Sequence, residues 1–466
     1  MSEHINSAEN IKVISIAFYS ERFDPKYIFV AGDATAAPTA AEIVIYEDIM
    51  KPYLTASLIF QDDQDFGKSI KGTEKVIVVL QSPGDKSQVI QKEFVVRSVE
   101  FREYITDTQA ILKINLIENY GYFDHINRFN LGYADTGENI IEKISTNIVG
   151  ASLFKDIKDS YQGAFRYIVP WITPFKAIKK VLSKMTTRTG LPYFYFSSLN
   201  TEFHNLTDLE TILEKGTINK GTPFIYSRGN TSADISLDLL PFIVEYYEAE
   251  QESHSLFLAE LGTFGSKISS INASTSLSYN TKINMAYELK LMEDAGVFER
   301  LGSKQQLNVF DTFFRAIDDF DKADIDITEF NSRVFYSIDS RTNDQSLKSP
   351  DRNLLGYNES LDEADTRLSI IRLAVLRYLI MNAVTIKVPG LFFSIKSLDT
   401  SVGNLIEFAM FENEKTLNER LGYNDDRSGQ FIILKKKHVI DLTSDAHTVQ
   451  MDISKIANLE ARSVGA

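Results

Sequence analysis

The chain has 466 residues, 44% of them hydrophobic and 11% aromatic, which is ample for packed cores and excludes a wholly disordered chain. It has no cysteine, which excludes disulfides, thiolate nucleophiles and cysteine-ligated zinc. The formal net charge of −15 argues against a DNA-binding domain, because such a domain normally carries a basic stripe.

Residues 1–125 carry the pattern of a β domain. Several segments alternate apolar and polar residues, as half-buried strands do, and breakers such as Lys51-Pro52 separate them. Many short strands in so few residues predict a small barrel or sandwich, and we expect an antiparallel β-barrel. The expected strands are Lys12–Phe18, Tyr27–Ala31, Glu42–Tyr46, Tyr53–Phe60, Lys75–Leu80, Phe94–Tyr104 and Ala110–Ile117.

Residues 126–263 are expected to form a mixed α/β domain. Isoleucines recur at helical spacing at positions 140, 141, 144 and 148. A second helix is predicted to begin at Pro174 with Thr173 as its N-cap and Gly190 as its C-cap. The apolar run Pro192–Phe196 then predicts a buried strand.

Strand patterns return at residues 264–293 and from residue 383 to the end, and together they predict a second barrel. Residues 294–382 read as an insertion that ends in a helix at 361–380, and the acidic segment 412–428 reads as a loop. The predicted fold is α+β and mainly β. It has two similar small antiparallel β-barrels joined by the α/β domain, with the insertion in the second barrel.

One hairpin pattern occurs near each end of the chain. Phe94–Leu116 and Phe431–Ile453 align without gaps at an offset of 337 residues. Apolar positions coincide, including Ile105 with Leu442, but only two of the 23 pairs are identical. The shared pattern therefore predicts two barrels of like fold and unlike surface.

No catalytic, cofactor or metal-binding motif is found. No histidines stand at HxxxH or HExxH spacing, although His438 and His447 flank one hairpin and could approach each other. There is no G-x-S-x-G, and Gly67-Lys68-Ser69 lacks the first glycine of a phosphate loop. The acidic segment 318–326 fails the EF-hand pattern and is expected to be a solvated face. We therefore expect no enzyme, no cofactor and no bound metal.

The only compact basic run is Lys435-Lys436-Lys437-His438. Lys435, Lys436 and Lys437 are candidates for a contact with a partner. The alternative is a hairpin edge on which lysines prevent aggregation, a usual device of edge strands.

No segment predicts membrane insertion. The N-terminus has neither a basic region nor a long apolar region of a signal peptide, so synthesis in the cytoplasm is expected. The most apolar stretch, Leu368–Ile386, is interrupted by Arg372 and Arg377, which favours a buried or interface helix.

Three segments together resemble the baseplate hub proteins of contractile-tailed bacteriophages, in the order of that family. Glu42–Asp63 (EIVIYEDIMKPYLTASLIFQDD) resembles the opening barrel of those proteins, with Lys51-Pro52-Tyr53-Leu54 between two strands. Tyr167–Phe196 resembles the middle region, where Pro-Trp-x-x-x-Phe leads into a helix and an aromatic strand. Val388–Phe393 followed by Phe431–Ile453 resembles the last barrel. The insertions are longer than in the T-even type.

The resemblance implies a homotrimeric structural hub in the tail baseplate of a virion, assembled in the host cytoplasm. In this family two barrels per subunit form a six-fold-like ring, which docks onto the tail tube or a tube-initiator protein. The other face holds a three-fold central spike, and baseplate wedge proteins are further candidate partners. DNA passes through the lumen during genome ejection without specific binding.

The sequence leaves two other functions open. Abundant carboxylates leave open a tail-tip cell-wall hydrolase, although no site for one is found. Abundant aromatic residues leave open a receptor-binding β protein, although no repeat array is found.

Overall fold

The chain is mainly β in a computed structural model, as its sequence predicts, with its largest sheet mostly antiparallel. This sheet has 13 strands, and three further sheets of three strands each are seen in the described residues. The structure describes residues 11–20, 23–31, 39–62, 66–81, 89–106, 109–158, 164–187, 190–227, 241–249, 265–272, 278–283, 333–339, 353–355, 363–390, 401–411, 427–444 and 446–457.

The first half of the large sheet lies where the sequence predicts strands. Its core contains Phe18, Phe60 and Leu112. Every second side chain of β5 and β7 is buried, because successive side chains of a strand point to opposite faces of the sheet. A short 3-10 helix, Phe66–Lys68, follows β4. The strands are β1 (Lys12–Ser20), β2 (Phe23–Val30), β3 (Thr39–Asp48), β4 (Thr55–Asp62), β5 (Lys75–Gln81), β6 (Val89–Tyr104) and β7 (Ala110–Glu118).

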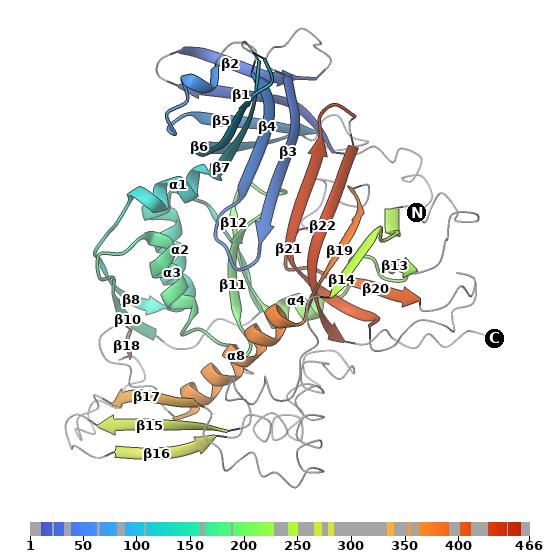
Figure 1. The fold of residues 1–466 in the computed structure, drawn as a ribbon. Helices are drawn as coiled ribbons and strands as arrows, with labels where there is room; N and C mark the ends of the chain where they lie inside the picture. Colours follow the sequence, from blue (N-terminus) through green and yellow to red (C-terminus); the bar gives the residue numbers. More distant parts are fainter. Residues whose placement is uncertain are drawn as a thin grey trace.

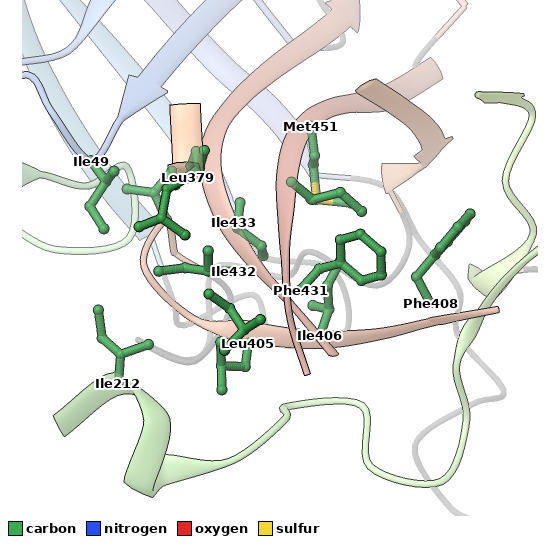
Figure 2. Packing of buried hydrophobic residues seen from close by; sticks show 14 of the residues in the cluster. Ile49, Ile212, Leu379, Leu405, Ile406, Phe408, Phe431, Ile432, Ile433 and Met451 are labelled. Atoms are coloured by element: carbon green, nitrogen blue, oxygen red, sulfur yellow. The ribbon is translucent and has the colours of Figure 1, made fainter. Parts of the chain in front are cut away.

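The second half of the sheet is built mainly from the end of the chain. A separate apolar core packs its strands against two helices, α4 (Leu209–Lys215) and α8 (Glu363–Met381). Phe408, Phe431 and Met451 lie in this core (Figure 2). The strands are β13 (Phe224–Ser227), β14 (Tyr246–Ala249), β19 (Ala383–Pro389), β20 (Leu405–Phe411), β21 (Gly429–Asp441) and β22 (Ala446–Ala457).

The two halves form one continuous sheet because β3 pairs with β21. These strands come from opposite ends of the chain and run side by side in Figure 1, one blue and one red. The strand order along the sheet is β14-β19-β22-β21-β3-β4-β7-β6-β5-β1-β2, with β20 and β13 branching from β21.

Five strands of one half match five strands of the other in order and register. The order β3-β4-β7-β6-β5 corresponds to β14-β19-β22-β21-β20, and every neighbouring pair within each set is antiparallel. Val96 pairs with Leu116 as Ile433 pairs with Ile453, which confirms the predicted offset of 337 residues at the hairpin base. Each hairpin then has a bulge directly after Val96 or Ile433.

The equivalence shifts by one residue toward the hairpin tips. β6 has a further bulge at Glu100, which β21 lacks. Beyond this bulge Tyr104 corresponds to Ile440. Tyr104 stands opposite Ala110 and Ile440 stands opposite His447, and these two partners are equivalent at the offset of 337 residues. The predicted match of Ile105 with Leu442 is therefore wrong by one position. The first hairpin has one extra residue in its bulge and one residue fewer in its turn. The two hairpins therefore have the same length, and a sequence alignment without gaps cannot detect the difference.

A mixed α/β region follows β7, with its own core that includes Ile144, Ile178 and Tyr195. The helix begins at Pro174 with Thr173 as N-cap, as predicted, and the buried strand at Tyr193–Ser197 is confirmed. Gly190 is not the C-cap, because the helix ends at Leu182; Gly190 instead occupies a turn at a φ of 83°. The elements are α1 (Asn119–Ile126), β8 (Gly132–Thr136), α2 (Gly137–Ile144), a π-helical turn (Ser145–Val149), β9 (Leu153–Asp156), β10 (Ala164–Ile168), α3 (Pro174–Leu182), β11 (Tyr193–Ser197), β12 (His204–Asp208) and α4 (Leu209–Lys215).

Residues 264–293, expected in the second barrel, pair elsewhere. β15 (Ser266–Asn272) lies between β16 (Ser278–Ile283) and β17 (Arg333–Asp339) in a separate sheet. β13 and β14 take the expected place beside β20 and β19. The sequence pattern identified strands here but carried no information about their partners, because alternation is local and pairing is not.

Two elements of the insertion also contact the rest of the chain. β18 (Asn353–Leu355) pairs with β10, and α8 (Glu363–Met381) places Leu379 in the core of the second half. The acidic segment 318–326 lies outside the described residues. Within the described residues no helix is long and apolar enough to cross a membrane.

The N-terminus of α4 offers a prediction of moderate size. The carboxylate of Asp208 accepts a hydrogen bond from the Thr211 backbone N–H at 2.8 Å, and the Thr211 hydroxyl donates to it at 2.8 Å. We expect Asp208→Ala to lower the free energy of unfolding by about 1–2 kcal/mol, because an N-cap and a buried partner are lost together. Urea titration measures this; Asp208→Asn, which keeps the cap, should lose less, and an equal loss would contradict the capping role.

Candidate functional site

The seam between the two halves of the sheet is formed by β3 and the outer half of β21, residues 435–441. The seam continues at both ends: the Ile49 N–H donates to the Leu434 carbonyl and the Leu442 N–H to the Ala41 carbonyl, each at 2.9 Å. Ile440 lies on the second half's strand but packs in the core of the first half. The seam is therefore an interface in which one half covers the core of the other.

A cluster of buried polar side chains lies in this seam. Lys436 and His438 are two residues apart on β21 and therefore share a face of the sheet, opposite Glu47 of β3. The Lys436 Nζ lies 3.2 Å from Glu47 Oε1, and His438 Nε2 lies 3.0 Å from the same oxygen. His447 of β22 stacks on His438, with 3.1 Å between its Nε2 and His438 Nδ1. All four side chains are buried. We call these four residues the seam cluster.

The charges in the seam cluster follow from burial and proximity. Burial raises the pKa of Glu47, but Lys436 and the His438 hydrogen bond outweigh it and hold that pKa at about 2. Burial lowers the pKa of Lys436, and Glu47 offsets part of this. Burial and the neighbouring Lys436 lower the pKa of His438, while burial and His438 lower that of His447. Glu47 and Lys436 thus form an ion pair beside two neutral imidazoles.

Neutrality fixes the direction of the hydrogen bonds. Since Glu47 can only accept, His438 Nε2–H donates to it, and His438 Nδ1 must then accept from His447 Nε2–H. His447 Nδ1 has no hydrogen-bond partner in the described residues. A Cβ added at Gly390 would lie 2.0 Å from that nitrogen, so the bare backbone of Gly390 packs against the imidazole.

A second buried polar group ties the α/β region to the seam. Lys92 of β6 donates to the carbonyls of Ser198 and Thr201, at 2.8 Å for Ser198. Glu118 of β7 accepts from the Ser197 hydroxyl at 2.9 Å and from the Leu54 N–H. The Ser198 hydroxyl donates to Glu47 at 3.3 Å, so residues 197–201 link both groups.

This arrangement suits a structural role, in which the seam cluster fixes the position of β21 on β3. The carboxylate, ammonium and imidazoles of the seam cluster contact one another and are buried, so a substrate could not reach them. Among the described residues no group of three or more histidine, aspartate or glutamate side chains could hold a metal ion. What the cluster does provide is specificity of register, because a shift of β21 along β3 would leave Glu47 buried without Lys436.

The three lysines predicted as a partner contact have different environments. Lys436 is buried, which rules out a contact with a partner. Lys435 is exposed and pairs with Asp452 at 3.0 Å, and the ammonium of Lys437 lies 6.0 Å from the Tyr46 ring centroid. A partner contact through Lys435 and Lys437 stays a prediction, whereas the edge-strand alternative is wrong, because β21 has a neighbouring strand on each side. The prediction that His438 and His447 approach each other is confirmed.

No protein-family model and no curated protein matches the chain. Its structural neighbours include a tail protein from Neisseria meningitidis MC58, 9% identical, with a TM-score of 0.48 over 96% of both chains. A 43 kDa tail protein of prophage MuSo2 from Shewanella oneidensis is 9% identical, with a TM-score of 0.47 over 95% of this chain and 98% of the other.

A further neighbour is the c3393 protein of E. coli, a component of the type VI secretion system described as similar to the T4 bacteriophage tail proteins gp27 and gp5. It is 7% identical, with a TM-score of 0.37 over 96% of this chain and 77% of the other. These structural neighbours are thus two tail proteins and a component of the type VI secretion system.

Proposed function

We propose that the chain is a structural hub of a phage tail baseplate. The observation that carries this proposal is the five-strand unit that occurs twice, in the same order and register, within one sheet. We take the two units as the two similar barrel-like domains of one subunit. The seam cluster holds these domains in a fixed relation, which an adaptor needs and an isolated binding domain does not.

The repeat explains how one protein could fit partners of different symmetry. Three subunits in a closed ring would present six similar units of two alternating kinds. Six similar units match a hexameric tail tube or tube initiator, and three true repeats match a trimeric central spike. Baseplate wedge proteins would contact the outer surface.

The proposal includes passage of DNA through the ring without specific binding. The formal net charge of −15 supports this part, because an acidic lumen repels the phosphate backbone and limits adhesion. The proposal also includes location in the virion, assembly in the host cytoplasm, and no catalytic activity.

The decisive experiment is the mass of the purified chain in solution. We expect mass photometry to show a particle with three times the 52.7 kDa of the chain, alone or together with its spike. A chain that stays monomeric in both cases would contradict the hub. The same preparation should not clear peptidoglycan in a zymogram or bind host cells, and a positive result would support the hydrolase or the receptor-binding protein instead.

A further inference from the structure

Because the five-strand unit occurs twice, each of the two seam strands has an equivalent strand in the other unit. In the described residues each of these two equivalent strands has one edge without a neighbouring strand. The equivalent of the outer half of β21 is Ser98–Tyr104 of β6, and the equivalent of β3 is β14. In the part of the chain that the structure describes, β14 pairs only with β19, and Ser98–Tyr104 pairs only with β7. One subunit thus contains one closed seam and the two halves of a second seam.

The exposure of β6 indicates that its outer half is normally covered. Ile440 on β21 is 2% exposed, whereas the equivalent Tyr104 on β6 is 53% exposed. Lys436 is 1% exposed and the equivalent Val99 is 40% exposed. Ile105 at the end of the strand is 55% exposed. An open strand edge with such apolar side chains is an aggregation hazard unless another chain pairs with it.

We propose that β14 of one subunit pairs antiparallel with the outer half of β6 of the next subunit, so that the seam is repeated between copies of this chain. This inference rests on the proposed ring, and it specifies which strands close that ring. The occupant is a second copy because the intramolecular seam already shows the same two surfaces joined, β3 with β21. A ring would leave neither edge exposed.

The register of the intermolecular pair follows from the intramolecular one. Ile43 lies opposite Ile440 in the seam, which places Tyr247 opposite Tyr104 between subunits. The backbone direction on the β6 side agrees with this register. The Ile105 N–H donates to the Gln109 carbonyl at 2.8 Å, so by alternation Tyr104 directs its backbone polar groups away from β7.

Two side-chain pairs would then meet on the other face of the new strand pair. Ile105 would lie opposite Tyr246, which is itself 46% exposed, and the two would form an apolar contact. Glu103 would lie opposite Glu248, a like-charged pair that weakens the contact. The seam has Val439 and Val44 at that position. The second seam is therefore weaker than the first, which suits a contact that forms during assembly.

Cysteine cross-linking tests the register, because the chain has no cysteine of its own. Residues 103 and 248 would form a non-hydrogen-bonded pair, whose Cα atoms lie about 4.5 Å apart and can be joined by a disulfide. We expect Glu103→Cys with Glu248→Cys to form covalent oligomers that end at the ring on a non-reducing gel. Either single variant, and Glu103→Cys with Ala249→Cys on the opposite face, should remain uncross-linked.

Glu103→Lys tests the same pair without a cross-link. It replaces a repulsive pair by an attractive one, so we expect the concentration at which the ring half-dissociates to fall about tenfold. Glu142→Lys on α2 makes the same charge change elsewhere and should leave it unaltered. A ring of the expected mass without specific cross-linking, or with no response to Glu103→Lys, would overturn the strand assignment and leave the hub intact. Absence of any ring would overturn both.

Discussion

Replacing Lys436 by methionine should destabilise the seam by about 3–5 kcal/mol, because it leaves Glu47 buried without its cation. Lys436 and Glu47 are both buried and lie 3.2 Å apart, so water cannot replace the lost partner. The pKa of Glu47, held at about 2 by Lys436 and His438, would rise, and the carboxyl would be protonated at a higher pH. Urea titration gives the free energy, and hydrogen exchange at the β3 and β21 amides locates the loss.

A double variant separates the buried charge from the loss of packing. Glu47→Gln with Lys436→Met removes both charges and keeps an acceptor oxygen for His438 Nε2–H, while the Ser198 hydroxyl can accept from the new amide, so it should recover most of the stability lost in Lys436→Met. Lys435→Met is the matched control, because Lys435 is more than half exposed and its pair with Asp452 is worth at most about 1 kcal/mol. Equal losses in Lys435→Met and Lys436→Met would contradict the role of the seam cluster.

The strands of the first half could be predicted because their signal is local. Alternation in Lys75–Leu80 and Ala110–Ile117 reports one buried face, and the structure has β5 and β7 at those positions. The repeated hairpin could be predicted for the same reason, up to the bulge at Glu100. A bulge changes which residues stand opposite each other without altering the apolar pattern enough to be noticed.

The seam cluster could not be predicted, because its pairing joins residues 391 positions apart, Glu47 and His438. One signal was present in the sequence. Lys436 and His438 stand at alternate positions with Ile440 on a strand, so all three share a face, and that face is buried. A charged residue in the buried phase of a strand indicates a partner of opposite charge, but only the fold identifies which of the 64 acids it is.

The strand edges show a related limit. Composition and pattern indicated a β-rich chain, but not which strands lack neighbours. Lysines at 435–437 suggested an edge at β21, yet that strand is central, and in the described residues the edges of the sheet include β2, β14 and the outer half of β6. The position of a strand within a sheet depends on the whole topology, whereas lysine content reports only the local sequence.

Acidification should destabilise the chain strongly, because three histidines are buried and neutral. Burial lowers the pKa of His204 to about 3, and burial also lowers the pKa values of His438 and His447. In the unfolded chain each histidine binds a proton below about pH 6.5, while in the folded chain it does not. Stability is therefore complete above about pH 6.5 and falls as the pH drops below it. His204, whose pKa burial lowers to about 3, contributes about 2 kcal/mol of loss between pH 7 and pH 5, and His438 and His447 add to this loss.

The histidine contribution can be isolated from that of the acids. Burial raises the pKa values of Glu118 and Asp124, so their protonation in the folded state opposes the loss as the pH falls. The contribution of Glu118 and Asp124 cancels when the pH slopes of the unfolding free energy are compared between variants, since every variant keeps both acids. His438→Gln with His447→Gln should reduce the slope of the unfolding free energy between pH 7 and pH 5, because two of the buried neutral histidines are gone. His125→Gln, at an exposed position of α1, is the matched control. If the double variant kept the full slope, the buried histidines would not be the source of acid sensitivity, and the hydrogen-bond directions assigned in the seam cluster would have to be revised.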